Sequence, residues 1–331
     1  MNKKFVLMIF INLFVFQCGL IGLVYKNKIA HKETTPQIEE KQEERQTSPI
    51  NQPINYTIET PRPSFLNNEA MIKQLSKWHE EAPKLTEVGT YGKTSQGKEI
   101  HYIRVTNFEK KPDKVVLITA CIHGNEPLCS STVMNYIGTI LDQYGDDPEI
   151  TALVDSRDIY FVPIVSPDSF PHSRHVDGVD PNRDFPTSKN PNKESVPPIK
   201  ALQEFFLKIN PNAVISGHTF GRVFLTPWGD QMQVSPNESD YQRVIGEMAR
   251  MCRYRIDRAC NNYGHPIYGS EVDWYYRHGA FSVVMEFGLH QRIPSQEEIN
   301  TEFERTFKGV LFFVKEAPDV EINKWVRLRA A

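Results

Sequence analysis

A histidine and a glutamate lie three positions apart in the segment Cys121-Ile122-His123-Gly124-Asn125-Glu126. On a turn that contains Gly124, an imidazole nitrogen and a carboxylate oxygen at this spacing can converge on one metal ion. His218 follows an apolar run much farther along the chain. Two histidines and one glutamate form a known catalytic zinc set that leaves a fourth position open for water. The three side chains therefore predict a zinc site, although His123 and Glu126 taken alone also fit an ordinary solvated turn.

Two further segments carry polar side chains suited to chemistry. The loop from Arg174 to Pro186 contains Arg174, Asn182 and Arg183. Their planar donors suit a carboxylate or a developing oxyanion, and the alternative is a surface loop with ordinary ion pairs. Glu286 interrupts an apolar run of the chain. Because burying an unpaired carboxylate is expensive, Glu286 is expected to face a metal, a partner or a cavity.

The elements that position these side chains alternate along the chain. Continuous apolar runs predict buried strands, and apolar residues at helical spacing predict helices between them. The alternation predicts an α/β fold with a mixed, mostly parallel central sheet and helices on both faces. The candidate residues lie at strand ends or in the loops beyond them, where open sheets bind ligands. Strands are expected over 114–120, 158–165, 213–216 and 281–285, and helices over 130–141, 199–209, 241–252 and 297–314.

The amino-acid composition and net charge argue against a nucleic-acid partner. Hydrophobic residues at 40% and charged residues at 24% fit a globular protein, and the formal net charge of -3 provides no polycation for nucleic acid. We therefore expect no nucleic-acid partner, and we expect a monomer. Five cysteines are too few for a disulfide scaffold. Cys252 and Cys260 could form a bridge in an exported domain, and separate buried thiols are the alternative.

The sequence divides into three parts. Residues 5–25 carry no charge and follow Lys3 and Lys4, a pattern long enough to cross a bilayer. Residues 1–25 are therefore predicted to be a membrane anchor or signal segment, with an uncleaved anchor favoured and the catalytic unit in the periplasm or at the cell surface. Residues 26–62 are rich in Glu, Gln, Lys, Thr and Pro and predict a flexible linker. Residues 63–331 form the predicted catalytic domain.

Taken in order, these segments resemble the funnelin-type zinc metallocarboxypeptidases, a family that includes digestive carboxypeptidases and compact bacterial enzymes acting on cell-wall peptides. The resemblance covers residues 56–314. It implies a bound Zn²⁺ and a peptide substrate with a free C-terminal carboxylate. The implied roles are zinc ligation by His123, Glu126 and His218, polarisation of the scissile carbonyl by Arg174, binding of the terminal carboxylate by Asn182 and Arg183, and general base catalysis by Glu286.

The same resemblance implies where the substrate's last residue binds. Alignment on the pair Gly269-Ser270 puts His265 where compact bacterial relatives carry a substrate-capping tyrosine, with Tyr263 and Tyr268 nearby. Val272 falls at the floor of the specificity pocket. An acid is expected there in enzymes that select a basic terminal residue, so Val272 does not support that selectivity. Cell-wall peptides are the expected substrates from the anchored context alone.

Two alternative functions remain open at the level of sequence. Zinc deacylases of the aspartoacylase and succinylglutamate desuccinylase kind also carry a His-Gly-Asn-Glu segment like the one from His123 to Glu126. A zinc protein that binds peptides without cleaving them would share the ligands as well. The stretch from Asp273 to Glu286 favours the peptidase over the deacylase, and Arg174 with Glu286 favours an enzyme over a binding protein.

Overall fold

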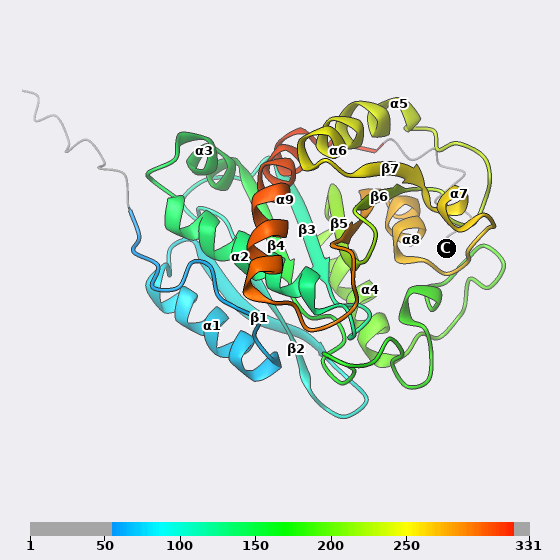
Figure 1. Cartoon of the computed structure of the whole chain (residues 1–331), viewed down its shortest axis with the longest axis horizontal. Coiled ribbons are helices and arrows are strands. Elements are labelled where there is room, and N and C mark those ends of the chain that lie inside the picture. The colour runs from blue at the N-terminus through cyan, green and yellow to red at the C-terminus, as the bar shows by residue number, and fades with distance from the viewer. Residues whose placement is uncertain (1–54, 321–331) are drawn as a thin grey trace, which may run out of the picture. The chain divides into compact units, whose positions relative to one another are not determined.

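One eight-stranded sheet organises residues 55–320, the part of the chain that the computed structural model describes (Figure 1). The strands have the order β1-β2-β4-β3-β5-β8-β6-β7. The pairs β3–β4, β3–β5, β5–β8 and β6–β7 are parallel, and β1–β2, β2–β4 and β6–β8 are antiparallel. This arrangement confirms the predicted mixed, mostly parallel sheet. The strands are β1 Thr86–Lys93, β2 Glu99–Val105, β3 Lys114–Ala120, β4 Arg157–Val162, β5 Ala213–Thr219, β6 Val223–Thr226, β7 Arg255–Arg258 and β8 Phe281–Phe287.

The central strands are buried on both faces, which explains their continuous apolar runs. In β3, Val116 and Ile118 pack into one hydrophobic cluster, whereas Leu117 between them packs into a second cluster on the other side. Successive side chains of a strand point to opposite faces, so these two clusters are the two faces of the sheet. Both faces must therefore be covered by other elements.

Helices cover both faces, as predicted. On one face α2 and α9 lie side by side (Figure 1), and Trp78 of α1 joins the same cluster. Phe205 of α4 and Tyr275 of α8 pack into the cluster on the other face. The helices are α1 Asn68–Glu81, α2 Pro127–Gln143, α3 Pro148–Ser156, α4 Pro197–Ile209, α5 Glu238–Asp240, α6 Gly246–Cys252, α7 Ala259–Tyr263, α8 Glu271–Arg277 and α9 Gln296–Glu316, with a 3₁₀ turn at Pro181–Arg183 and a π-helical turn at Tyr241–Ile245.

Local signals explain where several helices begin and end. The side chain of Asn67 accepts a hydrogen bond from the backbone N–H of Ala70 and so caps α1. Ser295 and Glu298 form a reciprocal capping box at the start of α9. Helix α4 is followed by Asn210, whose left-handed backbone with φ of 46° caps its C-terminus. All four predicted strands and all four predicted helices are present. The strand over 114–120 has the predicted ends, the helix expected over 241–252 begins with the π-helical turn, and the other elements differ at one or both ends.

Other sequence-based expectations fall partly or wholly outside the described residues. The apolar segment 5–25 and most of the predicted linker lie there, so the division of the chain at residues 25 and 62 stays a prediction. Ile58, near the end of that linker, is buried in the core. Within residues 55–320, no helix combines the length and the apolar character needed to cross a bilayer. Cys252 and Cys260 are separate buried free thiols rather than a bridge, and so are Cys121 and Cys129.

Candidate active site

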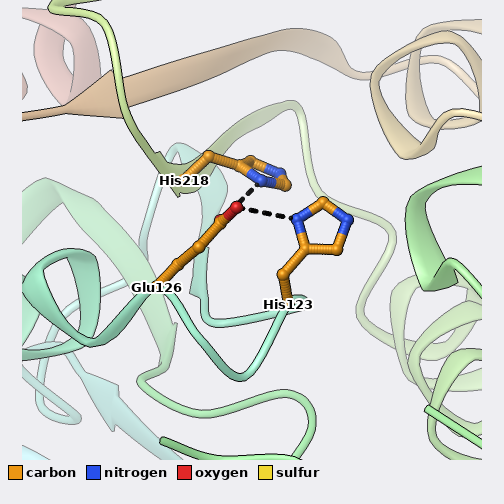
Figure 2. Close-up of side chains that lie close together, drawn as sticks. All are labelled: His123, Glu126 and His218. Carbon is orange, nitrogen blue, oxygen red and sulfur yellow. Dashed lines mark hydrogen bonds and ion pairs between the residues drawn. The ribbon is translucent and has the colours of Figure 1, made fainter. Parts of the chain in front are cut away.

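The three predicted metal ligands come together at the carboxyl ends of neighbouring parallel strands. His123 follows β3, Glu126 directly precedes α2, and His218 lies in β5. Nδ1 of His123 is 3.0 Å from one carboxylate oxygen of Glu126, and Nδ1 of His218 is 3.0 Å from the other (Figure 2). One ligand atom from each residue lies within 4.8 Å of the other two, and all three side chains are buried. Two imidazole nitrogens and one carboxylate oxygen are a donor set that suits Zn²⁺.

The outward-facing nitrogens of both histidines contact carboxylates. Nε2 of His123 is 3.0 Å from Oδ1 of Asp180, and Nε2 of His218 is 2.6 Å from Oε1 of Glu271. Such contacts fix the orientation of an imidazole and leave its other nitrogen directed at a metal. Neither Asp180 nor Glu271 was predicted from the sequence to have this role. Asp180 could have been suspected from its place beside Asn182, but Glu271 resembled an ordinary acid in the first turn of a helix.

The electrostatics of this cluster favour a cation. Three carboxylates, of Glu126, Asp180 and Glu271, surround two imidazoles. Burial acts to raise the pKa of Glu126, yet the imidazoles of His218 and His123 hold that pKa at about 2. Burial acts to lower the pKa of His218, and the carboxylates of Glu126 and Glu271 nevertheless raise it well above its usual value. A site that attracts positive charge this strongly fits a metal dication.

Glu286 lies beside the metal ligands on the next strand of the sheet. It is paired with His218 in the parallel register of β5 and β8. Its side chain is 8% exposed, and Oε2 has no hydrogen-bond partner among residues 55–320. Burial raises the pKa of Glu286 to about 7. A carboxyl group with this pKa and a free oxygen can both accept and return a proton near neutral pH.

The loop from Arg174 to Arg183 lies against the same cluster. Arg174 donates to Oδ2 of Asp180 from Nη2 at 2.9 Å, and its Nη1 is 3.7 Å from Oε1 of Glu126. Asn182 accepts a hydrogen bond from the backbone N–H of Glu271 at 2.9 Å. Arg183 donates to the carbonyl oxygen of Asn182, and its guanidinium lies 5.7 Å from the ring centre of Tyr263. The loop thus brings Arg174 next to the metal ligand Glu126 and holds Asn182 against α8.

A cavity of about 400 Å³ joins these groups. His123, Glu126, Arg174, Asn182, His218 and Glu286 line it together with Val272. Arg183 does not line it, and its Nη1 donates to the carbonyl oxygen of Asn182. His265 and Tyr268 do not line the cavity: His265 is exposed, and Tyr268 lies under Nζ of Lys189 at 3.9 Å. Tyr263 does line it. The structure therefore brings the predicted ligands, Glu286, Arg174, Asn182 and Val272 to one cavity. Arg183, His265 and Tyr268 are not among its lining residues.

Gln291 is a further cavity residue that the sequence did not reveal. Its side-chain amide donates to Oε1 of Glu126 at 3.0 Å and to the carbonyl oxygen of Thr219 at 2.8 Å. It lies in the loop between β8 and α9, where no motif marks it. These contacts tie the loop to the metal ligand Glu126.

Comparison with known proteins identifies the family to which this site belongs. The model of the zinc carboxypeptidase family matches residues 69–309. The chain belongs to the zinc carboxypeptidase family. It is 24% identical to carboxypeptidase A4 of Mus musculus over 294 residues, which cover 76% of this chain and 70% of that protein. It is 25% identical to a zinc carboxypeptidase of Simulium vittatum over 288 residues, covering 73% of this chain and 93% of the relative.

Solved structures confirm the zinc carboxypeptidase fold. The crystal structure of thrombin activatable fibrinolysis inhibitor superposes with a TM-score of 0.69 at 17% identity, covering 76% of this chain and 74% of that one. Carboxypeptidase A from Helicoverpa armigera superposes with a TM-score of 0.66 at 18% identity, covering 76% of this chain and 73% of that one. The family match and the site together make this chain a zinc metallocarboxypeptidase, a hydrolase, which decides against the deacylase and the non-catalytic binding protein.

The contact between Glu271 and His218 leads to a prediction about metal affinity. In a Glu271→Gln variant a neutral amide replaces the carboxylate beside Nε2 of His218, so the imidazole becomes a weaker ligand. We expect the affinity for Zn²⁺ to fall by about tenfold, as for other carboxylates that orient metal-binding histidines. Competition with a chromophoric chelator measures this affinity, and Glu69→Gln, at an exposed position in α1, is the matched control. Equal affinities in the two variants would contradict the assignment.

Proposed function

We propose that Glu286, Arg174, Asn182 and Arg183 carry out the hydrolysis of the last peptide bond of a substrate, beside a Zn²⁺ held by His123, Glu126 and His218. The observation that carries this proposal is the buried, unpartnered oxygen of Glu286 in the same cavity as the three converging ligand atoms. Burying a carboxyl group without a hydrogen bond lowers the stability of the folded protein. Groups of this kind are found mainly at functional sites, where the reaction requires them.

Each side chain has a separate task in this proposal. A bound Zn²⁺ supplies a Lewis acid and lowers the pKa of water toward about 7. Glu286 accepts a proton from the attacking water and later donates it to the leaving amine. Arg174 borders the cavity next to Glu126, and its positive charge stabilises the negative charge that develops on the scissile carbonyl oxygen. Exclusion of water by the substrate strengthens both effects.

Asn182 and Arg183 bind the terminal carboxylate of the substrate in this proposal. The side-chain oxygen of Asn182 is occupied by the backbone N–H of Glu271, which leaves its NH₂ group as a donor toward the cavity. Arg183, whose guanidinium donates to the carbonyl oxygen of Asn182, adds a positive charge. Tyr263 borders the cavity beside Arg183 and is our candidate for the residue that covers the bound substrate. A covering role for His265 or Tyr268, and a floor role for Val272, remain predictions.

The test of the proposal compares one acylated dipeptide with its C-terminal amide and with an N-succinyl amino acid. Hydrolysis of the free acid alone is the expected result, because only that substrate presents a terminal carboxylate next to a peptide bond. An Arg183→Gln variant should raise KM for the free acid by about tenfold, since it loses a charge-assisted contact. Lys200→Gln, at an exposed position in α4, is the control. Equal cleavage of acid and amide would refute the proposal.

We also propose that residues 5–25 anchor the chain in a membrane and that the catalytic unit faces the periplasm or the cell surface, acting there on cell-wall peptides. The uncharged stretch after Lys3 and Lys4 supports the anchor. Fractionation of cells that express either the full chain or a chain starting at residue 55 tests it. We expect the full chain in the membrane fraction and the short chain in the soluble one; a soluble full chain would contradict the anchor. Digestion of purified cell-wall peptides, followed by mass analysis of the products, tests whether these peptides are substrates.

A further inference from the structure

We propose that the cavity selects peptides whose C-terminal residue has an acidic side chain, and that Arg255 recognises that side chain. The inference rests on the proposed removal of a terminal residue and adds the substrate class. Arg255 is the first residue of β7 and borders the same cavity as the metal ligands and Glu286. No motif in the sequence marked it, because its place beside the cavity depends on the order of the strands.

The strand register directs Arg255 toward the catalytic groups. Val223 of β6 is paired with Glu286 of β8 on one side and with Arg255 of β7 on the other. Residues that are directly paired across neighbouring strands point to the same face of the sheet. Glu286, Val223 and Arg255 therefore form one row, and all three border the cavity. Helix α7 lies beside β6 and β7 (Figure 1), and its residues Ala259 and Tyr263 also border the cavity.

The wall between Glu286 and Arg255 is apolar. A small hydrophobic cluster at this end of the cavity consists of buried side chains without hydrogen-bonding groups: Val223, Leu225, Ala259, Ile267, Val272 and Val284. This surface suits the aliphatic stem of a substrate side chain. The apolar surface cannot form hydrogen bonds with a polar group at the end of that side chain. Such a group must therefore contact one of the few polar residues nearby. Arg255 and Asn262 are such neighbours, and Ser270 supplies a buried hydroxyl that has no hydrogen-bond partner among residues 55–320.

The positive charge of Arg255 has no acidic partner among the residues that border the cavity. Arg174 is paired with Asp180, whereas Arg255 forms no ion pair within the described part of the chain. The acids that border the cavity are Glu126 and Glu286, which are committed to the metal and to proton transfer. The substrate's terminal carboxylate pairs with Arg183. A second carboxylate on the substrate would therefore neutralise Arg255, whereas a lysine or arginine side chain would meet a like charge and find no acid.

The test uses four acylated dipeptides that differ only in the last residue: Glu, Gln, Leu and Lys. Gln matches Glu in shape and lacks the charge. For the unchanged protein we expect kcat/KM for the Glu peptide to exceed that for the Gln peptide by about tenfold, with the Lys peptide poorest. In Arg255→Gln the preference for Glu over Gln should disappear while the Leu peptide is cleaved as before. Arg253→Gln, at an exposed position two residues away, is the matched control and should keep the preference.

The possible outcomes separate this inference from the proposed function. Cleavage of the peptides without a preference for Glu over Gln would overturn the acidic-residue selectivity alone. An equal loss for all four peptides in Arg255→Gln would also overturn it, because Arg255 would then bind the terminal carboxylate that they share. Failure to cleave any of the four would overturn the proposed function and this inference with it.

Discussion

Replacement of Glu286 by Gln is expected to leave Zn²⁺ bound while lowering kcat by about 10²- to 10⁴-fold, the usual contribution of a positioned general acid–base group. The amide fills the same space but cannot accept the proton from water or return it to the leaving amine. Glu286 is not one of the three converging ligands, so the metal content should not change. Its Oε2 has no hydrogen-bond partner among residues 55–320, so little native contact is lost.

Three measurements on the same preparation check this prediction: kcat, zinc content and melting temperature. A large fall in kcat with the other two quantities unchanged is the expected pattern. Glu204→Gln, at an exposed position in α4, is the matched control and should retain full activity. Undiminished turnover in Glu286→Gln would refute the assignment of the general base. Loss of zinc together with turnover would instead mean that Glu286 supports the metal site.

Removal of the metal is expected to abolish hydrolysis and to destabilise the fold. Without a cation, the buried carboxylates of Glu126 and Glu271 share the positive charge of the His218 imidazole, whose two nitrogens they contact. Binding of a cation to the folded state alone stabilises it by linkage, by about 2.7 kcal/mol when the free metal is at 100 times its dissociation constant. Treatment with a chelator should therefore lower the melting temperature as well as the rate of peptide cleavage.

Restoration of the metal separates this effect from damage to the protein. Added Zn²⁺ should return both the activity and the melting temperature, whereas Mg²⁺ should not, because Mg²⁺ prefers an all-oxygen octahedral site and two of the three ligands here are nitrogens. His218→Ala should resemble the chelated protein and should not respond to Zn²⁺. A metal-free protein that hydrolyses peptides as fast as the loaded one would contradict the zinc site altogether.

Sequence patterns correctly predicted those site residues that lie in one short turn or within one buried strand. His123 and Glu126 share a single turn, His218 and Glu286 each lie in a buried strand, and the apolar runs around them predict those strands. The family resemblance rested on these local segments, and the fold and the family match confirmed it. Local sequence was sufficient to predict these strands, because a strand that is buried on both faces consists of a continuous run of apolar residues.

Only the tertiary structure decided which distant residues meet. Glu271 contacts His218 because α8 packs beside β5, and Arg255 borders the cavity because β7 is two strands away from β8 in the sheet. For the same reason Tyr263, rather than His265, lies against the cavity. Glu271 and His218 are 53 residues apart in the sequence. The hydrophobic periodicity around a single charged side chain does not indicate which distant residue it will contact. The order and register of the strands, which long-range packing sets, supplied that information.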